Sequence, residues 1–135
     1  MRRLKFEDND IYHIYNRGTE KRAIVIDEQD HFRFIHNLFE FNDDAPAENI
    51  YYKTQNFQSY EAEPRKIKRE LLVKILAFCL MSNHVHLLLR QKQEEGIARF
   101  MQKLGTGYTM YFNKKYKRTG HLFQGKFKAV PVEHD

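Results

Sequence analysis

The chain is poor in several residue types, and each shortage excludes a class of protein. Its 135 residues include one cysteine and no tryptophan. A single cysteine cannot form an intramolecular disulfide or a zinc site built from several thiolates. Because Cys79 stands in an apolar run, we expect it to be a small core side chain in a reducing compartment.

Long hydrophobic runs are also missing. No window approaches the roughly 18 uninterrupted apolar residues of a transmembrane helix, and the N-terminus lacks the apolar centre of a secretion signal. These absences predict a cytoplasmic protein without a membrane partner.

The two serines, Ser59 and Ser82, do not lie in a nucleophile-elbow sequence, and no Walker-type phosphate loop is present. Serine hydrolases and P-loop enzymes are therefore not indicated.

Positive charge and aromatic rings are what the chain has in excess. Lysine and arginine outnumber aspartate and glutamate by 23 to 18, which gives a net charge of +5, and there are 11 Phe and 8 Tyr. A basic balance favours an anionic partner such as nucleic acid, through phosphate contacts and counterion release. An ordinary basic soluble protein has the same balance, so charge alone does not decide.

Hydrophobic periodicity predicts a single domain of mixed strands and helices over 1–135. The first helix starts at the N-cap residue Asp27 and carries an apolar stripe of Phe32, Ile35, Leu38 and Phe39. The stripe of the second helix steps by four and three residues: Ile97, Met101, Leu104, Tyr108, Tyr111. Gly105 and Gly107 within that helix suggest a close backbone approach or a bend.

Strands are expected between and around these helices. The predicted elements are strands at 11–16, 71–80, 84–90 and from about 121 to Pro131, and helices at 27–41 and 94–116. The last strand is expected to bulge at Gly125. The order strand, helix, strand, strand, helix, strand predicts an α+β, ferredoxin-like split-βαβ fold, with an antiparallel sheet covered by two helices on one face.

Residues 42–66 have a different character. They are polar, contain Pro46 and Pro64, and show no clear period, so we expect a loop or insertion. Two roles are open for the aromatic residues of this segment, packing on the domain or stacking on bases. These residues are Tyr51, Tyr52, Phe57 and Tyr60.

Two histidines lie one residue apart in the sequence SNHVHLLL, residues 82–89. Strand alternation places Val85, Leu87 and Leu89 on one face, which suits the core, and His84 and His86 on the other. Two imidazoles about 6.6 Å apart along a strand can converge on one divalent metal. Exposed or hydrogen-bonded histidines explain the same pattern.

A third histidine bears on this pair. In a split-βαβ fold the first strand lies beside the third, so His13 is expected near the face of His84 and His86. It could reach the same metal, or it could simply be hydrogen bonded to a neighbouring strand or loop.

A cluster of six basic residues lies late in the chain and is interleaved with the aromatic residues Tyr116, Phe123 and Phe127. Alternating cations and rings suit single-stranded or hairpin nucleic acid, through phosphate contacts and base stacking. A solvated helix end with its rings turned to the core has the same composition. The basic residues are Lys114, Lys115, Lys117, Arg118, Lys126, Lys128.

Four separated stretches resemble one family. They are YHI with NRG at 12–18, FCLMSNHVHLL at 78–88, YTMYFN at 108–113 and GHLFQGKF at 120–127. Together they resemble the catalytic domain of REP-associated tyrosine transposases, relatives of insertion-sequence transposases in the HUH endonuclease superfamily. The match covers almost the whole chain except the insertion at 42–66.

The resemblance implies a fold and a chemistry. It implies the ferredoxin-like core, a divalent metal, Mg²⁺ or Mn²⁺, held by His84 and His86, and binding of single-stranded or hairpin DNA with Arg17 among the contacts. A tyrosine of the family attacks the scissile phosphate and forms a 5′-phosphotyrosine, so strand transfer needs no nucleotide cofactor. Relatives occur as homodimers and as monomers, and the sequence does not choose between them.

The chain departs from the family at the nucleophile. The family's tyrosine lies in a Tyr-Ile-His-like segment after the last strand, and we expect it beyond Asp135 together with the polar residue that completes the metal site. Tyr116 is the weak candidate within the chain, because Tyr108 and Tyr111 lie on the apolar stripe. The chain is therefore expected to be a catalytically incomplete transposase domain.

Two other classes of function stay open at this point. The first is a nucleic-acid-binding module of the same fold without catalysis, in which His84 and His86 are structural. The second is a small metal-binding or regulatory domain that does not bind nucleic acid. A preference for DNA hairpins over duplex would separate the first from the second.

Overall fold

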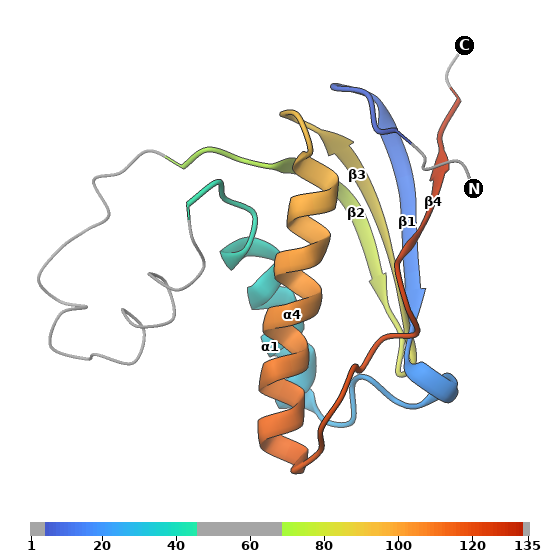
Figure 1. Cartoon of the computed structure of the whole chain (residues 1–135), viewed down its shortest axis with the longest axis vertical. Coiled ribbons are helices and arrows are strands. Elements are labelled where there is room, and N and C mark those ends of the chain that lie inside the picture. The colour runs from blue at the N-terminus through green and yellow to red at the C-terminus, as the bar shows by residue number, and fades with distance from the viewer. Residues whose placement is uncertain (1–4, 46–68, 134–135) are drawn as a thin grey trace, which may run out of the picture.

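A four-stranded antiparallel sheet with two helices on one face makes up the part of the chain that the computed structural model describes, residues 5–45 and 69–133 (Figure 1). The strands are β1 (Ile11–Arg17), β2 (Val73–Leu80), β3 (His84–Gln91) and β4 (Lys128–Pro131). The helices are α1 (Glu28–Glu40) and α4 (Gly96–Tyr116), and a short 3₁₀ turn, η1, spans Thr19–Lys21.

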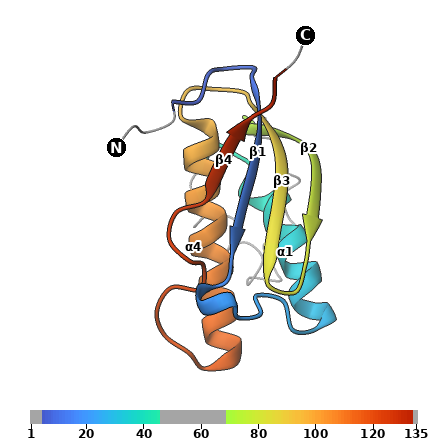
Figure 2. The same ribbon diagram turned by 90° about the vertical axis from the view of Figure 1, so that its right-hand side faces the viewer.

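The strand order β2-β3-β1-β4 confirms the predicted ferredoxin-like topology. All three neighbouring pairs are antiparallel, and the first strand lies beside the third as expected. In Figure 2 the sheet faces the viewer, and both helices lie behind it. One face of the sheet is therefore covered by helices, and we call the other the open face.

Local sequence explains where the first helix begins. The Asp27 carboxylate accepts from the backbone N–H of Asp30, and the Asp30 carboxylate accepts from that of Asp27, which makes a reciprocal capping box. At the start of α4 there is no such side-chain cap, and Glu95 adopts a left-handed conformation with φ 61°.

The core lies between the helices and the covered face of the sheet. β1 and β3 contribute alternate residues, as period-two burial requires. α4 contributes most of its predicted stripe, and burial at four of those positions confirms that prediction, while Tyr111 is only partly buried. The largest fully buried side chains include Ile14, Phe34, Leu87, Leu89, Phe100, Leu104, Tyr108, Phe112.

The predicted stripe of α1 was partly wrong. Phe32 and Phe39 are exposed to 63% and 66%, whereas Phe34 and Leu38 are buried. Buried Asn37 also lies on this face. The helix turns Phe34 and Leu38, which are four residues apart, toward the sheet, and this leaves the flanking rings at the surface.

Cys79 is exposed, which corrects the prediction of a core side chain. A β-bulge explains the error: the register of β2 on β3 shifts between Ile75 and Ala77, so the strand gains one residue there. An extra residue reverses the alternation beyond it. Cys79 consequently lies opposite His86, on the open face.

The last strand is shorter than predicted. Only Lys128–Pro131 pairs with β1, and residues 121–127 form an irregular segment that folds over the end of β1. The Gln124 N–H donates to the Arg17 carbonyl at 2.9 Å, and the Thr19 N–H donates to the Leu122 carbonyl at 2.8 Å. Gly125 has φ 69°, which bends the segment out of a strand conformation.

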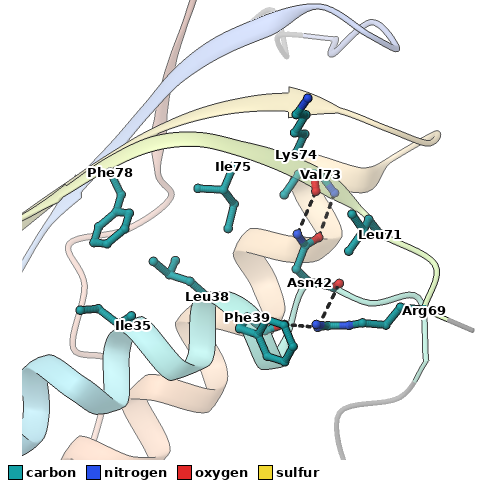
Figure 3. A pocket seen from close by; sticks show the side chains of 10 residues that line it. All are labelled: Ile35, Leu38, Phe39, Asn42, Arg69, Leu71, Val73, Lys74, Ile75 and Phe78. Atoms are coloured by element: carbon teal, nitrogen blue, oxygen red, sulfur yellow. Dashed lines mark hydrogen bonds between the residues drawn. The ribbon is translucent and has the colours of Figure 1, made fainter. Parts of the chain in front are cut away.

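The first residues of the expected 42–66 loop belong to the folded domain. Asn42 is buried, and its side chain donates to the Val73 carbonyl at 2.8 Å and accepts from the Val73 N–H (Figure 3). It also accepts from the backbone N–H of Leu72. It therefore connects the end of α1 to the start of β2. Residues 46–66, including the four aromatic residues predicted to pack or to stack, lie outside the described residues.

Gly107 confirms the predicted close approach in α4. A Cβ atom at this position would lie 2.3 Å from a ring carbon of Phe41, whereas one at Gly105 would meet nothing within 4 Å. The absence of a side chain at Gly107 thus lets the end of α1 pack against α4.

No helix within the described ranges is long and apolar enough to cross a membrane.

Candidate functional site on the open face of the sheet

His84 and His86 lie on the open face, as strand alternation predicted. Along β3 the burial alternates between half-buried and buried, and both histidines take half-buried positions. In the register of β1 on β3, Arg17 stands opposite His84 and Tyr15 opposite His86. The centres of the two imidazole rings are 5.1 Å apart.

His13 joins the pair through a hydrogen bond. Its Nε2 lies 3.0 Å from Nδ1 of His86, and the two rings are nearly parallel, with 21° between their planes. His13 stands opposite Leu88, so it is diagonal to His86 across the two strands. This bond matches the alternative in which His13 is bonded to a neighbouring strand.

His84 has a side-chain partner of its own. Its Nδ1 lies 2.7 Å from the amide oxygen of Asn83. The Tyr15 ring stacks on His86, with ring centres 5.9 Å apart. Each imidazole of the pair is therefore held in place by a neighbour.

The electrostatics of the cluster favour a neutral ring at His86. Burial, together with the neighbouring His13 and His84, lowers the pKa of His86 below its ordinary value. A neutral imidazole offers a lone pair to a metal ion, whereas a protonated one cannot.

The donor set suits half of an open metal site. Mn²⁺ and Mg²⁺ both prefer oxygen ligands, so two neutral imidazoles would bind either ion only together with oxygen donors. No group of three His, Cys, Asp or Glu side chains that could hold a metal ion exists within 5–45 and 69–133. His84 and His86 could therefore hold two coordination positions, and oxygen ligands would have to occupy the others.

Two of the predicted DNA contacts lie on the same face of the sheet as the histidines. Arg17 is exposed at the end of β1, and its Nε donates to the side-chain oxygen of Gln124 at 2.7 Å. Lys128 is exposed on β4, opposite Tyr15. The same face carries Arg90 and Lys74, which stand opposite each other on β3 and β2 and which sequence reasoning missed. Arg90 has the strand parity of His84 and His86, and that signal could have found it.

The other predicted contacts lie apart from the histidines. The end of α4 points to the same end of the molecule as the start of β3, but on the helix side of the sheet (Figure 1). Lys114, Lys117 and Lys126 are exposed there or in the segment that follows. The Arg118 guanidinium donates hydrogen bonds to the Asn113 side-chain oxygen and to the His121 carbonyl.

Lys115 is held in ion pairs. Its amine lies 2.7 Å from the Asp27 carboxylate and 2.9 Å from that of Asp30. Asp30 is fully buried, and it also accepts hydrogen bonds from the hydroxyls of Tyr111 and Tyr116. These contacts join the start of α1 to the end of α4.

Tyr116 is part of that network. Burial and the hydrogen bond to Asp30 raise the pKa of its hydroxyl. Tyr108 is fully buried and its hydroxyl donates to the Ile24 carbonyl. Both tyrosines thus lie on α4, behind the sheet as seen from the histidines (Figure 2).

A family comparison gives the class of protein to which this fold and site belong. The family model of IS200-like transposases matches residues 11–135. The chain therefore belongs to the IS200-like transposase family, whose members act in DNA binding and transposition and generally use a divalent metal.

Two solved structures share the fold. A REP-associated tyrosine transposase bound to a REP hairpin matches with a TM-score of 0.62 at 9% identity, over 100% of this chain and 63% of that one. A candidate transposase from Deinococcus radiodurans R1 matches with a TM-score of 0.57 at 16% identity, over 98% of this chain and 87% of that one. The chain thus spans less than two thirds of the REP-associated relative. None of the curated proteins compared with it matches.

Proposed function

We propose that the open face binds single-stranded DNA next to a hairpin, and that a divalent metal at His84 and His86 supports cleavage and strand transfer there. The observation that carries this proposal is the gathering of imidazoles and cations on one face. His84 and His86 face the same side as Arg17 and Lys128, across three adjacent strands. The solved relative that binds a REP hairpin supports the choice of DNA.

Each group on this face has a distinct part in the proposal. Arg17 and Lys128 neutralise phosphates and set the path of the strand. Tyr15 and the imidazole rings offer flat surfaces for bases. A bound metal ion would withdraw charge from the scissile phosphate, and the two imidazoles would hold it.

The proposed reaction needs a nucleophilic tyrosine. Tyr15 lies on the open face, but its ring stacks on His86, and the family resemblance implies a nucleophile after the last strand. Attack of its oxygen on phosphorus forms the 5′-phosphotyrosine, and the 3′ oxygen leaves and takes up a proton as a free 3′-OH. Tyr116 hydrogen bonds to Asp30 behind the sheet, and Tyr15 precedes the histidine strand instead of following the last strand. We therefore propose that the nucleophile is a tyrosine outside residues 1–135. The described residues then supply binding and metal ligation.

A binding experiment tests the DNA part. Fluorescence anisotropy should show tighter binding of a hairpin with single-stranded flanks than of a duplex of equal length. Arg17→Ala combined with Lys128→Ala should weaken hairpin binding by about tenfold or more, since each phosphate contact contributes to affinity and to its salt dependence. Lys92→Ala, an exposed cation just after β3, is the matched control. Equal affinity for both DNAs would rule the proposal out.

A titration with Mn²⁺ tests the metal part. The paramagnetic ion should broaden the ring resonances of His84 and His86 first, while His31 and His36 on α1 keep theirs. His84→Ala and His86→Ala should each remove the effect at the other ring. Broadening confined to α1, or none at millimolar Mn²⁺, would contradict metal binding at the pair.

A covalent-adduct experiment tests the assignment of the nucleophile. Residues 1–135 incubated with hairpin DNA and Mn²⁺ should give no protein–DNA adduct on a denaturing gel, and Tyr116→Phe should behave identically. An adduct that disappears in Tyr116→Phe would make Tyr116 the nucleophile.

A non-catalytic DNA-binding module is the second candidate. One observation favours it: within the described residues no third His, Cys, Asp or Glu side chain forms a metal site with His84 and His86. In that case hairpin binding persists, and His84→Ala and His86→Ala change it only slightly.

A further inference from the structure

Each imidazole of the pair has one engaged ring nitrogen and one unengaged. Nδ1 of His84 contacts Asn83, and Nδ1 of His86 contacts His13. Neither Nε2 has a hydrogen-bond partner among the residues that the structure describes. The hydrogen bond at one nitrogen decides which tautomer a neutral imidazole adopts, and so which nitrogen keeps a lone pair.

The tautomer of His84 follows from the orientation of Asn83. The Asn83 Nδ2 donates to the Lys21 carbonyl at 3.4 Å, which turns its oxygen toward His84. An amide oxygen only accepts, so Nδ1 of His84 must carry the proton. Nε2 of His84 is thereby left with its lone pair.

The bond between His13 and His86 could run in either direction. A proton on Nδ1 of His86 makes His13 the acceptor and leaves Nε2 of His86 with a lone pair. A proton on Nε2 of His13 has the opposite consequence, because the neutral His86 ring then carries its own proton on Nε2. Only the first arrangement gives both members of the pair the same free nitrogen.

We propose that His13 is a positioning residue that accepts from Nδ1–H of His86, as Asn83 accepts from His84, so that both Nε2 atoms are free to bind a cation. Metal-binding histidines commonly use their second nitrogen in this way, and the partner fixes the ring and makes it a better ligand. The inference rests on the proposed function, because the free nitrogens matter only if a metal ion binds there. The tautomers themselves do not depend on bound metal or DNA.

The tautomers can be measured directly in the metal-free protein. Long-range ¹H–¹⁵N spectra at pH 8 should show Nδ1–H at both His84 and His86. His13→Phe keeps a flat ring beside Tyr15 but removes the acceptor, so His86 should lose its preference for Nδ1–H. His13→Gln places an amide oxygen there and should restore it in part. His31→Gln on α1 is the control, and near-ultraviolet circular dichroism checks the fold.

Metal affinity provides the second readout. His13→Phe should weaken Mn²⁺ binding by about 10–100-fold, the usual cost of losing a partner of a metal ligand, and His13→Gln should recover part of the loss. The inference fails if His86 carries its proton on Nε2 in the unaltered protein, or if His13→Phe leaves its tautomer unchanged. If the tautomers are as expected and Mn²⁺ does not bind at all, the proposed metal site is wrong and the tautomer assignment holds.

Discussion

The two faces of the sheet are built from the same strands but with opposite chemistry. On β3 the residues toward the helices, Val85, Leu87 and Leu89, are at most 2% exposed. The alternate residues His84 and His86 are half-buried and bonded to other side chains. Stability therefore depends on one face, and the proposed chemistry on the other. Substitutions on one face should consequently have little effect on the property that belongs to the other.

The largest effect is expected from adjacent leucines on β3. Leu87→Ala should lower the free energy of unfolding by about 2–5 kcal/mol, because it leaves a cavity in a packed core. Leu88→Ala, on the open face, should cost less than about 1 kcal/mol. Urea denaturation measures both. Similar losses for the two variants would show that the open face is also packed in solution.

Acid should destabilise the contact between α1 and α4, because protonation of Asp30 removes its ionic partner interactions. Burial alone would raise the pKa of Asp30, but hydrogen bonds from Tyr116, Lys115 and Tyr111 outweigh it and lower the pKa to about 2. Since the folded-state value lies below the ordinary 3.8, this stabilisation is complete above about pH 4 and is lost as the pH falls toward 2. It amounts to about 2–3 kcal/mol.

Denaturation as a function of pH tests this assignment. Asp30→Asn should be less stable at pH 7 and should lose little more between pH 4 and pH 2. The more exposed Asp44→Asn is the control and should keep the acid dependence of the unaltered protein. An identical acid profile for Asp30→Asn would assign the acid sensitivity to other carboxylates.

The two glycines of α4 test how tightly the helices pack. Gly107→Ala should cost about 1–3 kcal/mol, because its Cβ would overlap the Phe41 ring. Gly105→Ala has open space and should stabilise the helix by up to about 1 kcal/mol. Thermal unfolding of the two variants should shift in opposite directions. A stabilising Gly107→Ala would mean that α1 does not pack on α4 as described.

The smallest effect on stability is expected from Lys128 on the open face. Lys128→Ala should change the free energy of unfolding by less than about 0.5 kcal/mol. It should nevertheless reduce the slope of the logarithm of hairpin affinity against the logarithm of salt concentration by about the amount that one phosphate contact contributes. Binding measured at several salt concentrations gives this slope, and Lys92→Ala should leave it unchanged.

Sequence reasoning predicted the fold from the order of strands and helices, and it predicted the face of the two histidines from strand alternation. Cys79 was expected in the core because it stands in an apolar run, but the bulge between Ile75 and Ala77 places it on the open face. The bond between His13 and His86 could not be predicted, because it depends on the register of two strands that are far apart in the chain. The ion pairs that engage Lys115 depend likewise on how α1 meets α4.

The separation of the two site strands along the chain has a consequence for how the family can vary. His13 and His86 are 73 positions apart, and the link between them includes residues 46–68. The entropy cost of closing such a link grows only slowly, by about 0.6 kcal/mol for each doubling of its length. Inserting or deleting ten residues within 46–68 should therefore change the stability of the His13–His86 contact very little.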